Sequence, residues 1–186
     1  LTPALAMLPT ETKYTKPSLL PHKTLTLGEK DMMVDEKVLT STESRTTHLR
    51  NYNDDGLCIN YKRLKELSKT EQREIFKHKL VYVFYNILDD NLHGCSSSTF
   101  RTTCEQCFKD LEQLVGFIHD TANVTEIHIT SDHGFLYNDK AFLDKDKEKV
   151  NDDYMELTTR YYSTENDHDV KGLTKFSLPA VSAMTD

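Results

Sequence analysis

A long apolar run over residues 80–88, Leu-Val-Tyr-Val-Phe-Tyr-Asn-Ile-Leu, constrains the fold of this chain more than any other feature. Such a run is typical of a strand buried on both faces of a parallel sheet. Residues 98–120 then place apolar side chains at helical spacing, and residues 125–131 alternate and are rich in Ile and Thr. A strand, a helix and a strand in this order predict a right-handed βαβ unit with parallel strands, and therefore an α/β fold.

Shorter elements are predicted on both sides of this unit. We expect strands at residues 23–27 and 32–39 with a hairpin turn at Asp35 and Glu36, helices at 42–52, 61–67 and 68–77, a loop at 53–56 and a third strand at 154–163. The helix from residue 68 opens with Ser-Lys-Thr-Glu, which is a capping box.

Composition limits the class of protein. The 186 residues, 37% of them hydrophobic, fit a single domain over residues 1–186 with a core of normal size. The formal net charge of −7 argues against tight general binding to a nucleic-acid backbone. No apolar stretch is long enough to span a bilayer, and the first residues lack the layout of a signal peptide. We therefore expect a cytoplasmic protein with no membrane partner.

An Asp-His pair follows the last predicted strand of the βαβ unit, in Thr130-Ser131-Asp132-His133-Gly134. A carboxylate and an imidazole suit zinc, manganese and similar divalent ions. Neighbouring residues of a strand face opposite ways, so both side chains reach one metal only if the backbone turns, and Gly134 permits such a turn. The alternative interpretation is a polar corner between a strand and a loop.

A second pair, Asp89-x-x-x-His93, follows the apolar run 80–88. It offers another oxygen and nitrogen ligand at the same kind of strand end, so two neighbouring strands could supply a two-metal site. Asp90 is a competing ligand in that turn. Solvated loop charge is the alternative interpretation of this pair.

Two hydroxyl groups stand near the start of the chain, on Thr10 and Thr12 behind Pro9. A hydroxyl becomes a useful nucleophile when a metal lowers its pKa. An ordinary helix cap and turn is the alternative, because Ser and Thr are common before helices.

Taken in order, these blocks resemble the PglZ domain of the alkaline phosphatase superfamily. The blocks that carry the resemblance are residues 9–12 with 19–22, residues 81–89 and residues 130–137. The resemblance implies a three-layer α/β/α fold with a mostly parallel sheet, like that of alkaline phosphatase. PglZ proteins are components of BREX phage-resistance systems, and the superfamily uses two metal ions to transfer phosphoryl or sulfuryl groups.

The same resemblance implies roles for individual residues. Thr12 takes the position of the nucleophile, with Thr10 as the fallback. Asp89 and His93 would hold one metal, and Asp132 and His133 the other. The expected metal is zinc, with manganese or magnesium as alternatives. The implied function is a metal-dependent phosphatase or phosphodiesterase activity, with other phage-defence proteins as partners and a phosphorylated substrate, of which nucleic acid is one candidate.

Three departures from the family pattern shape this prediction. A further aspartate ligand normally precedes the nucleophile, where this chain has only residues 1–8. The last histidine ligand normally lies further C-terminal, and the nearest candidate, His168, stands in an acidic stretch; Tyr85 stands where the family tends to show His. We therefore expect a fragment of a PglZ domain, without the first strand and the C-terminal part, that is inactive alone. The alternative is a non-catalytic interaction module of the defence complex that keeps the fold with an incomplete metal site.

The cysteines suggest a third possibility, a zinc-stapled binding module built on Cys104-x-x-Cys107. Both residues, however, lie on the apolar stripe predicted for helix 98–120, which also includes Phe108. Free cysteine packs well as a small hydrophobic residue. We therefore predict that these two cysteines are reduced and packed in the core, and Cys58 and Cys95, on either side of the apolar run, offer no second pair.

Overall fold

The computed structural model describes residues 6–28, 31–93, 96–134, 143–150, 154–158, 161–167 and 169–177. The chain forms two compact units. One, the central unit, comprises residues 37–130, and the other, the terminal unit, comprises residues 1–36 together with 131–186. A single domain over residues 1–186 stays a prediction.

The central unit contains most of the regular structure. Its elements are β3 (Lys37–Val38), α2 (Thr42–Leu49), β4 (Gly56–Asn60), α3 (Tyr61–Glu66), α4 (Lys69–Ile75), β5 (Leu80–Phe84), α5 (Ile87–Leu92) and α6 (Ser97–Asp120). The predicted helices at 42–52, 61–67 and 68–77 are confirmed as α2, α3 and α4. Capping boxes at Ser41 and Ser68 explain where α2 and α4 begin, because each satisfies backbone N–H groups of the first turn.

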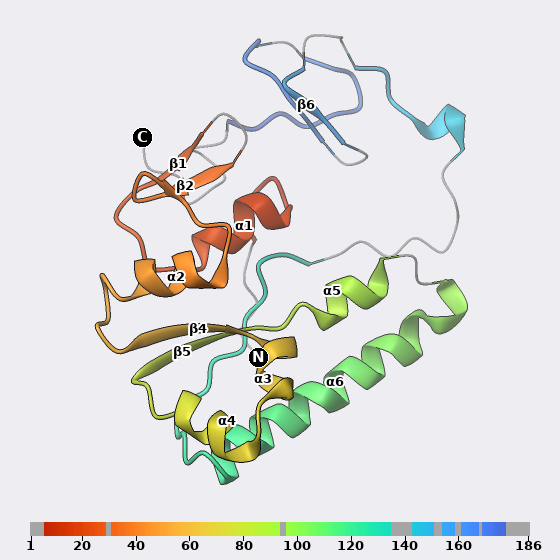
Figure 1. Cartoon of the computed structure of the whole chain (residues 1–186). Helices are drawn as coiled ribbons and strands as arrows, with labels where there is room; N and C mark the ends of the chain where they lie inside the picture. Colours follow the sequence, from red (N-terminus) through yellow and green to blue (C-terminus); the bar gives the residue numbers. More distant parts are fainter. Residues whose placement is uncertain are drawn as a thin grey trace. The chain divides into compact units, whose positions relative to one another are not determined.

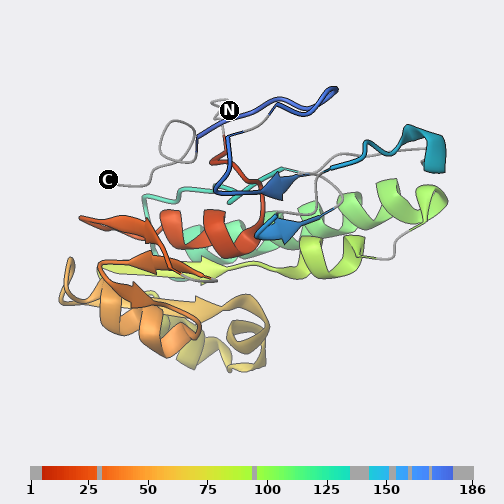
Figure 2. The same ribbon diagram turned by 90° about the horizontal axis from the view of Figure 1, so that it is seen from above.

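A parallel pair of strands is the centre of this unit. β4 and β5 run in register from Gly56 opposite Leu80 to Asn60 opposite Phe84. Helices α2 and α3 pack against β4, and α5 packs along α6 (Figures 1 and 2). The predicted α/β class with a parallel sheet is therefore confirmed, while the three-layer arrangement stays a prediction.

The apolar core of the central unit joins the sheet to three helices. Ile59 of β4, Leu64 of α3 and Ile118 of α6 are each at least 93% buried and meet Phe76, which follows α4. Half-buried apolar side chains surround this cluster: Leu67, Ile75, Val81, Val83, Leu114, Phe117, Ala122, Val124 and Ile127. The amphipathic stripe of α6 thus meets the sheet that it was expected to cover.

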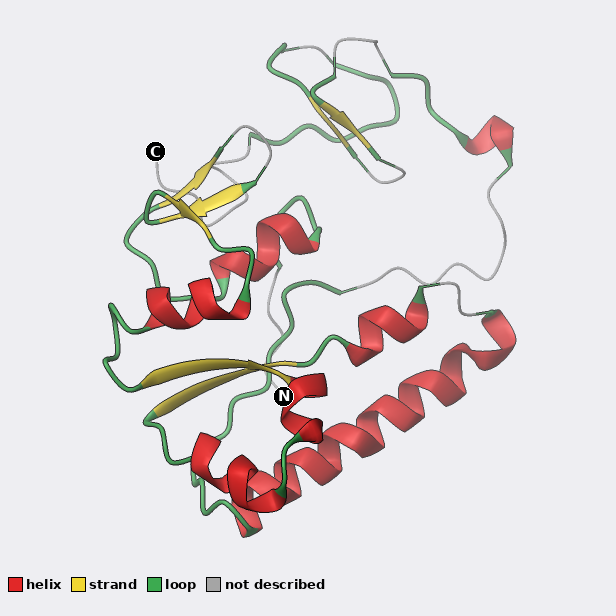
Figure 3. Ribbon diagram, in the orientation of Figure 1, coloured by secondary structure: helices red, strands yellow, loops and turns green. Residues whose placement is uncertain are grey.

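Two details of the predicted βαβ unit are wrong. β5 ends at Phe84 rather than at residue 88, and a short helix, α5, begins at Ile87. Residues 125–130 form no strand and are drawn as a loop (Figure 3). Val124 and Ile127 still pack against the core, whereas Ile129 is 68% exposed, so the apolar alternation predicted burial only in part. A strand also requires a hydrogen-bonded neighbour, which side-chain alternation does not supply.

The partner of β5 is instead β4, which was not predicted. Gly56 opens this strand, and a Cβ atom there would lie 2.7 Å from Leu49 Cγ and 3.0 Å from the Asn53 carbonyl oxygen. The backbone therefore approaches α2 as closely as only glycine allows. The residues before it make the predicted loop, and the apolar residues after it make the strand.

The terminal unit is built from segments that are far apart in the sequence. Its described elements are α1 (Thr12–Ser18), β1 (Leu25–Leu27), β2 (Met32–Val34), a 3₁₀ turn η1 (Asp144–Asp146), β6 (Glu156–Leu157) and β7 (Tyr162–Ser163). β1 and β2 are antiparallel with Leu25 opposite Val34, and α1 packs against β2 (Figure 1). β6 and β7 form a second antiparallel pair, where a single strand was predicted at 154–163.

Turns in the terminal unit follow local chemistry. Asp35 and Glu36 have φ angles of 47° and 66°, so the predicted hairpin turn is found, with the left-handed backbone of a type I′ turn. Asp35 Oδ1 accepts hydrogen bonds from the backbone N–H groups of Lys23 and Thr24, at 2.8 Å and 2.9 Å.

Among the described residues of the whole chain, no helix is both long and apolar enough to cross a membrane.

Candidate active site

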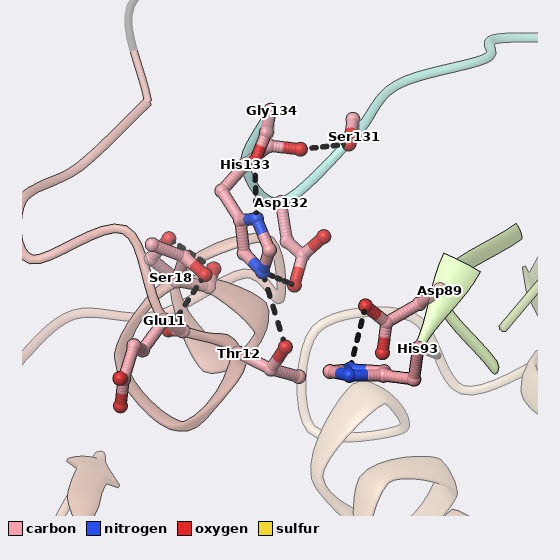
Figure 4. A network of polar contacts seen from close by, with 10 residues as sticks. Glu11, Thr12, Ser18, Asp89, His93, Ser131, Asp132, His133 and Gly134 are labelled. Carbon is pink, nitrogen blue, oxygen red and sulfur yellow. Dashed lines mark hydrogen bonds and ion pairs between the residues drawn. The ribbon is translucent and has the colours of Figure 1, made fainter. Parts of the chain in front are cut away.

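Thr12 is the first residue of α1, and Glu11 before it has extended backbone angles. Its side-chain oxygen lies 3.2 Å from His133 Nε2, across 121 residues of sequence (Figure 4). Thr10, the fallback nucleophile, lies two residues before the helix. The terminal unit therefore brings together the predicted nucleophile and one predicted metal ligand.

The ring of His133 is oriented by the backbone. Its Nδ1 lies 2.7 Å from the Gly134 carbonyl oxygen, which can only accept a hydrogen bond. Nδ1 therefore carries the proton, and in the neutral ring Nε2 has a free lone pair. It follows that the Thr12 hydroxyl donates to His133 Nε2, and that this nitrogen faces the centre of the site.

Asp132 completes a small polar group with these two residues. Its Oδ2 lies 3.7 Å from His133 Nε2, and the side chains of Asp132 and His133 are 25% and 16% exposed. The backbone does turn here, as the motif required, because Ser131 Oγ donates to the His133 carbonyl oxygen at 2.6 Å. Gly134 plays no special part in that turn: its φ is not positive and its α-carbon faces open space. That detail of the sequence-based prediction is wrong.

Asp89 and His93 lie in the central unit, on a helix rather than at the predicted end of a strand. Asp89 is in the first turn of α5 and His93 caps its end, so the spacing of four residues puts them on one helix face. His93 Nε2 lies 3.4 Å from Asp89 Oδ1, and both side chains are largely exposed (Figure 4). Asp90, the competing ligand, accepts instead from Lys62 Nζ at 2.7 Å. Convergence of this pair with Asp132 and His133 stays a prediction.

The donor atoms around Thr12 can be compared with the needs of a metal ion. Ligands of a tetrahedral zinc ion at about 2.0–2.1 Å stand about 3.3 Å from one another. The separations from His133 Nε2 to Thr12 Oγ1 and to Asp132 Oδ2, 3.2 Å and 3.7 Å, lie on either side of this value. The atoms therefore fit part of a metal shell. Within the described residues no group of three or more His, Cys, Asp or Glu side chains comes together, and His168 lies outside them.

Tyr85, which stands where the family tends to show histidine, is half-buried in the central unit. Its hydroxyl donates to the Cys107 carbonyl oxygen at 3.2 Å, and its ring packs against Tyr61 with centroids 4.7 Å apart. Burial, reinforced by the nearby Cys107, raises the pKa of Tyr85 far above its usual value of 10.0. This side chain is thus a neutral packing group.

The cysteines are free thiols in the described chain. Cys107 and Cys58 are 1% and 3% exposed, and Cys104 is half-buried, so core packing is confirmed for Cys107 and partly for Cys104. Burial raises the pKa of Cys58 to about 11. Phe108, assigned to the same stripe, is 60% exposed, because the buried line of α6 runs through its neighbour Cys107. Cys95 lies outside the described residues.

Sequence reasoning missed one polar cluster close to Thr12. Glu156 of β6 accepts hydrogen bonds from Lys13, Tyr14 and Tyr161. Lys13 and Tyr14 directly follow Thr12 in α1. No sequence signal could have joined Tyr14 to Glu156, because 142 residues separate them.

The sequence of this chain is similar to that of a known protein family. The family described as "BREX system PglZ alkaline phosphatase-like domain" matches residues 1–182. The chain belongs to the PglZ family. It is 30% identical, over 181 residues, to the alkaline phosphatase-like protein PglZ of Bacillus cereus (strain H3081.97), a match that covers 94% of this chain and 21% of that protein.

A second relative is the alkaline phosphatase-like protein BrxZ of Escherichia coli O9:H4 (strain HS), 33% identical over 150 residues, 77% of this chain and 17% of that protein. This PglZ chain thus spans about a fifth of the length of the curated relatives that it matches. No solved structure matches it.

Proposed function

We propose that this PglZ chain forms part of a metal-dependent phosphoesterase, with Thr12 as the nucleophile, that acts in phage defence. The observation that carries the proposal is the hydrogen bond from the Thr12 hydroxyl to His133 Nε2, beside Asp132. It favours Thr12 over Thr10, because it shows which hydroxyl faces the Asp-His pair. Membership of an alkaline phosphatase-like family supports the same chemistry.

The chemistry proposed is an in-line displacement at phosphorus. Thr12 Oγ1 loses its proton to solvent and forms a bond to phosphorus while the bond to the leaving oxygen breaks, and the leaving oxygen takes up a proton from water. A water molecule then attacks phosphorus, the bond from Thr12 Oγ1 to phosphorus breaks, and Thr12 regains its proton. Asp132 and His133 would hold one divalent ion, and Asp89 and His93 a second. When bound, such ions supply positive charge that lowers the pKa of the hydroxyl and offsets charge at phosphorus. The bond from His133 Nδ1 to the Gly134 carbonyl oxygen holds the ring so that Nε2 faces Thr12.

Zinc is the metal we propose, with manganese or magnesium as alternatives, because carboxylate and imidazole ligands suit these ions. Other proteins of a BREX system are the proposed partners, since the family is named for that system. The proposed substrate is phosphorylated, with nucleic acid as one candidate, and a cytoplasmic location stays a prediction.

A non-catalytic interaction module is the second candidate function. The observation that favours this module is that the described residues nowhere bring together three or more side chains that could hold a metal ion. In this case Asp132 and His133 would serve only to hold Thr12 and the start of α1 in place.

Metal titration separates these functions. Calorimetric titration of the chain with Zn²⁺ and Mn²⁺ should show binding that Asp132→Ala and His133→Ala each remove. A matched control is the exposed pair His119 and Asp120, whose side chains are 2.7 Å apart on α6, so His119→Ala should change nothing. Binding that survives Asp132→Ala but is lost in Cys104→Ala would instead support the zinc-stapled module. If the wild-type chain binds neither Zn²⁺ nor Mn²⁺ even in large excess of metal, the non-catalytic module is favoured.

A further inference from the structure

The side chain of Glu156 is a meeting point for three hydrogen-bond donors. Its Oε1 accepts from Lys13 Nζ, and its Oε2 accepts from Tyr14 Oη at 2.7 Å and from Tyr161 Oη at 2.9 Å. Two of the donors lie in α1 and the third beside β7. One carboxylate therefore ties α1 to the pair of strands β6 and β7, all within the terminal unit.

The helix held in this way is weak by itself. α1 has seven residues, includes Pro17, and begins at Thr12; Glu11 before it makes no side-chain capping hydrogen bond. Helices of this length are not stable in isolation, so contacts with the rest of the chain must hold it. Tyr14 and Thr15 are 6% and 1% exposed and provide the apolar part of that anchorage. Glu156 provides a charged part, at the turn of helix that begins with Thr12.

The ionic character of the cluster supports this. Burial acts to raise the pKa of Glu156, but the hydrogen bonds from Lys13, Tyr14 and Tyr161 outweigh it and hold that pKa below the ordinary value of 4.5. Burial acts to lower the pKa of Lys13, and the bond to Glu156 reverses the effect, so that pKa is raised. The pKa of Tyr161 is raised mainly by burial and next by its hydrogen bond to Glu156, and Glu11 also acts to raise it. At neutral pH the cluster is a charged pair with two neutral phenols.

We infer that Glu156 is a positioning residue for Thr12: by binding Lys13 and Tyr14 it fixes the first turn of α1 and thereby sets the Thr12 hydroxyl against His133. The functional meaning of this inference rests on the proposed role of Thr12, whereas the geometric claim does not. Lys13 is, on this view, engaged by Glu156 and serves the helix rather than the substrate.

Nuclear magnetic resonance of the whole chain tests the inference without any assay of activity. The first readout is the exchange of the Tyr14 and Thr15 amide hydrogens, which donate to the Glu11 carbonyl oxygen at 2.9 Å and 3.0 Å. The second is the nuclear Overhauser effect between the Thr12 methyl group and the His133 ring. The third is the ¹⁵N chemical shifts of that ring. The variants are Glu156→Ala, Glu156→Gln and Tyr161→Phe. Glu165→Gln, an exposed glutamate in the same segment, is the matched control.

In Glu156→Ala we expect the two amides to exchange about tenfold faster or more, because charged hydrogen bonds are lost from a locally opening segment. The Thr12–His133 Overhauser effect should disappear, and the ring shifts should move toward those of Thr12→Val. Glu156→Gln, which keeps an acceptor oxygen but loses the charge, should lie between Glu156→Ala and wild type. Tyr161→Phe should have a smaller effect, and Glu165→Gln none.

Unchanged contacts between Thr12 and His133 in Glu156→Ala would overturn the inference. If that variant unfolds the terminal unit, Glu156→Gln and Tyr161→Phe decide: changes confined to α1 and His133 support positioning, and changes spread equally over β1 and β2 show a merely structural role. Where turnover is measurable, kcat should fall about tenfold or more with KM nearly constant, since the hydroxyl is misplaced rather than binding lost. If a version extended at both ends toward the length of the relatives has no turnover, while the expected resonance changes are still seen in Glu156→Ala, the proposed function alone fails.

Discussion

The two units of this chain differ in the contacts that join segments far apart in the sequence. The central unit, residues 37–130, surrounds a parallel strand pair with an apolar cluster and with helices that have capping boxes. The terminal unit joins α1 to segments more than a hundred residues away through polar contacts, at His133 and at Glu156. Apolar packing therefore holds the strand pair of the central unit and its helices, whereas polar contacts arrange the side chains around Thr12. Substitutions should distinguish the two kinds of contact.

The largest expected effect concerns catalysis by the terminal unit. We predict little or no phosphoesterase activity for the chain alone, because its described residues bring together fewer than three ligands at any one place and an incomplete shell holds metal weakly. Beside a version extended at both ends toward the length of the relatives, with zinc and manganese supplied, turnover of a generic phosphodiester should be at least about 100-fold slower. Thr12→Ala in the extended version should abolish turnover. Equal rates for both versions, with loss in Thr12→Ala, would show that the residues of this chain suffice.

Next in size is the loss of apolar packing in the central unit. Ile118→Ala should lower the free energy of unfolding by about 2–4 kcal/mol, because Ile118 is 6% exposed and meets three other buried side chains. Thermal or urea unfolding followed by circular dichroism measures this. The matched control is Ile129→Ala in the same unit, where the side chain is 68% exposed and the cost should stay below about 0.5 kcal/mol. Equal costs at the two sites would refute the assignment of the core.

The reactivity of the cysteine thiols tests how well the central unit buries them. Cys58 and Cys107 should react with a thiol reagent at least about 100-fold more slowly in the native chain than in denaturant, because both thiols are buried and burial also raises the pKa of Cys58. Cys104, which is half-buried, should react at an intermediate rate. Single Cys→Ala variants assign each rate. Rapid labelling of Cys107 in the native state would contradict the packing of α6.

Acid should weaken the terminal unit through Glu156. Because its pKa is held below 4.5 when folded, the folded state binds this proton less readily than the unfolded state. The stabilisation is therefore complete above the ordinary pKa and is lost as the pH falls through the lowered one. Melting of the α1 amide signals, followed from pH 7 down to pH 3, should show this loss, and Glu156→Gln should show a flatter dependence. A variant as acid-sensitive as wild type would assign the loss to another group.

The smallest effect is expected at a helix cap of the central unit. Ser68→Ala removes the side chain that accepts from the Glu71 N–H group, and should cost about 1 kcal/mol. Ser68→Thr, which keeps the hydroxyl, is the control and should cost less. Amide exchange in the first turn of α4 measures both. An effect on α1 instead of α4 would show that the two units are coupled through this cap.

The sequence by itself determined the parts of the molecule that depend on neighbours along the chain. Helical spacing predicted α6, the Ser68 capping box predicted α4, and the Asp-Glu pair predicted the turn after β2, because propensity, capping and turn geometry act over a few residues. Three ordered motifs also identified the PglZ family, which the comparisons confirm. The roles of Asp89 and His93 as ligands stay predictions.

Only the tertiary structure decided which segments meet. It paired β5 with the unpredicted β4 rather than with residues 125–131, because backbone hydrogen bonds join strands whatever their distance in sequence. It placed Asp89 on a helix, α5, which begins at Ile87 within the run that was predicted to be a strand. It set Thr12 against His133 and gathered Lys13, Tyr14 and Tyr161 around Glu156. Such polar contacts depend on positions in space, and no local pattern in the sequence records them.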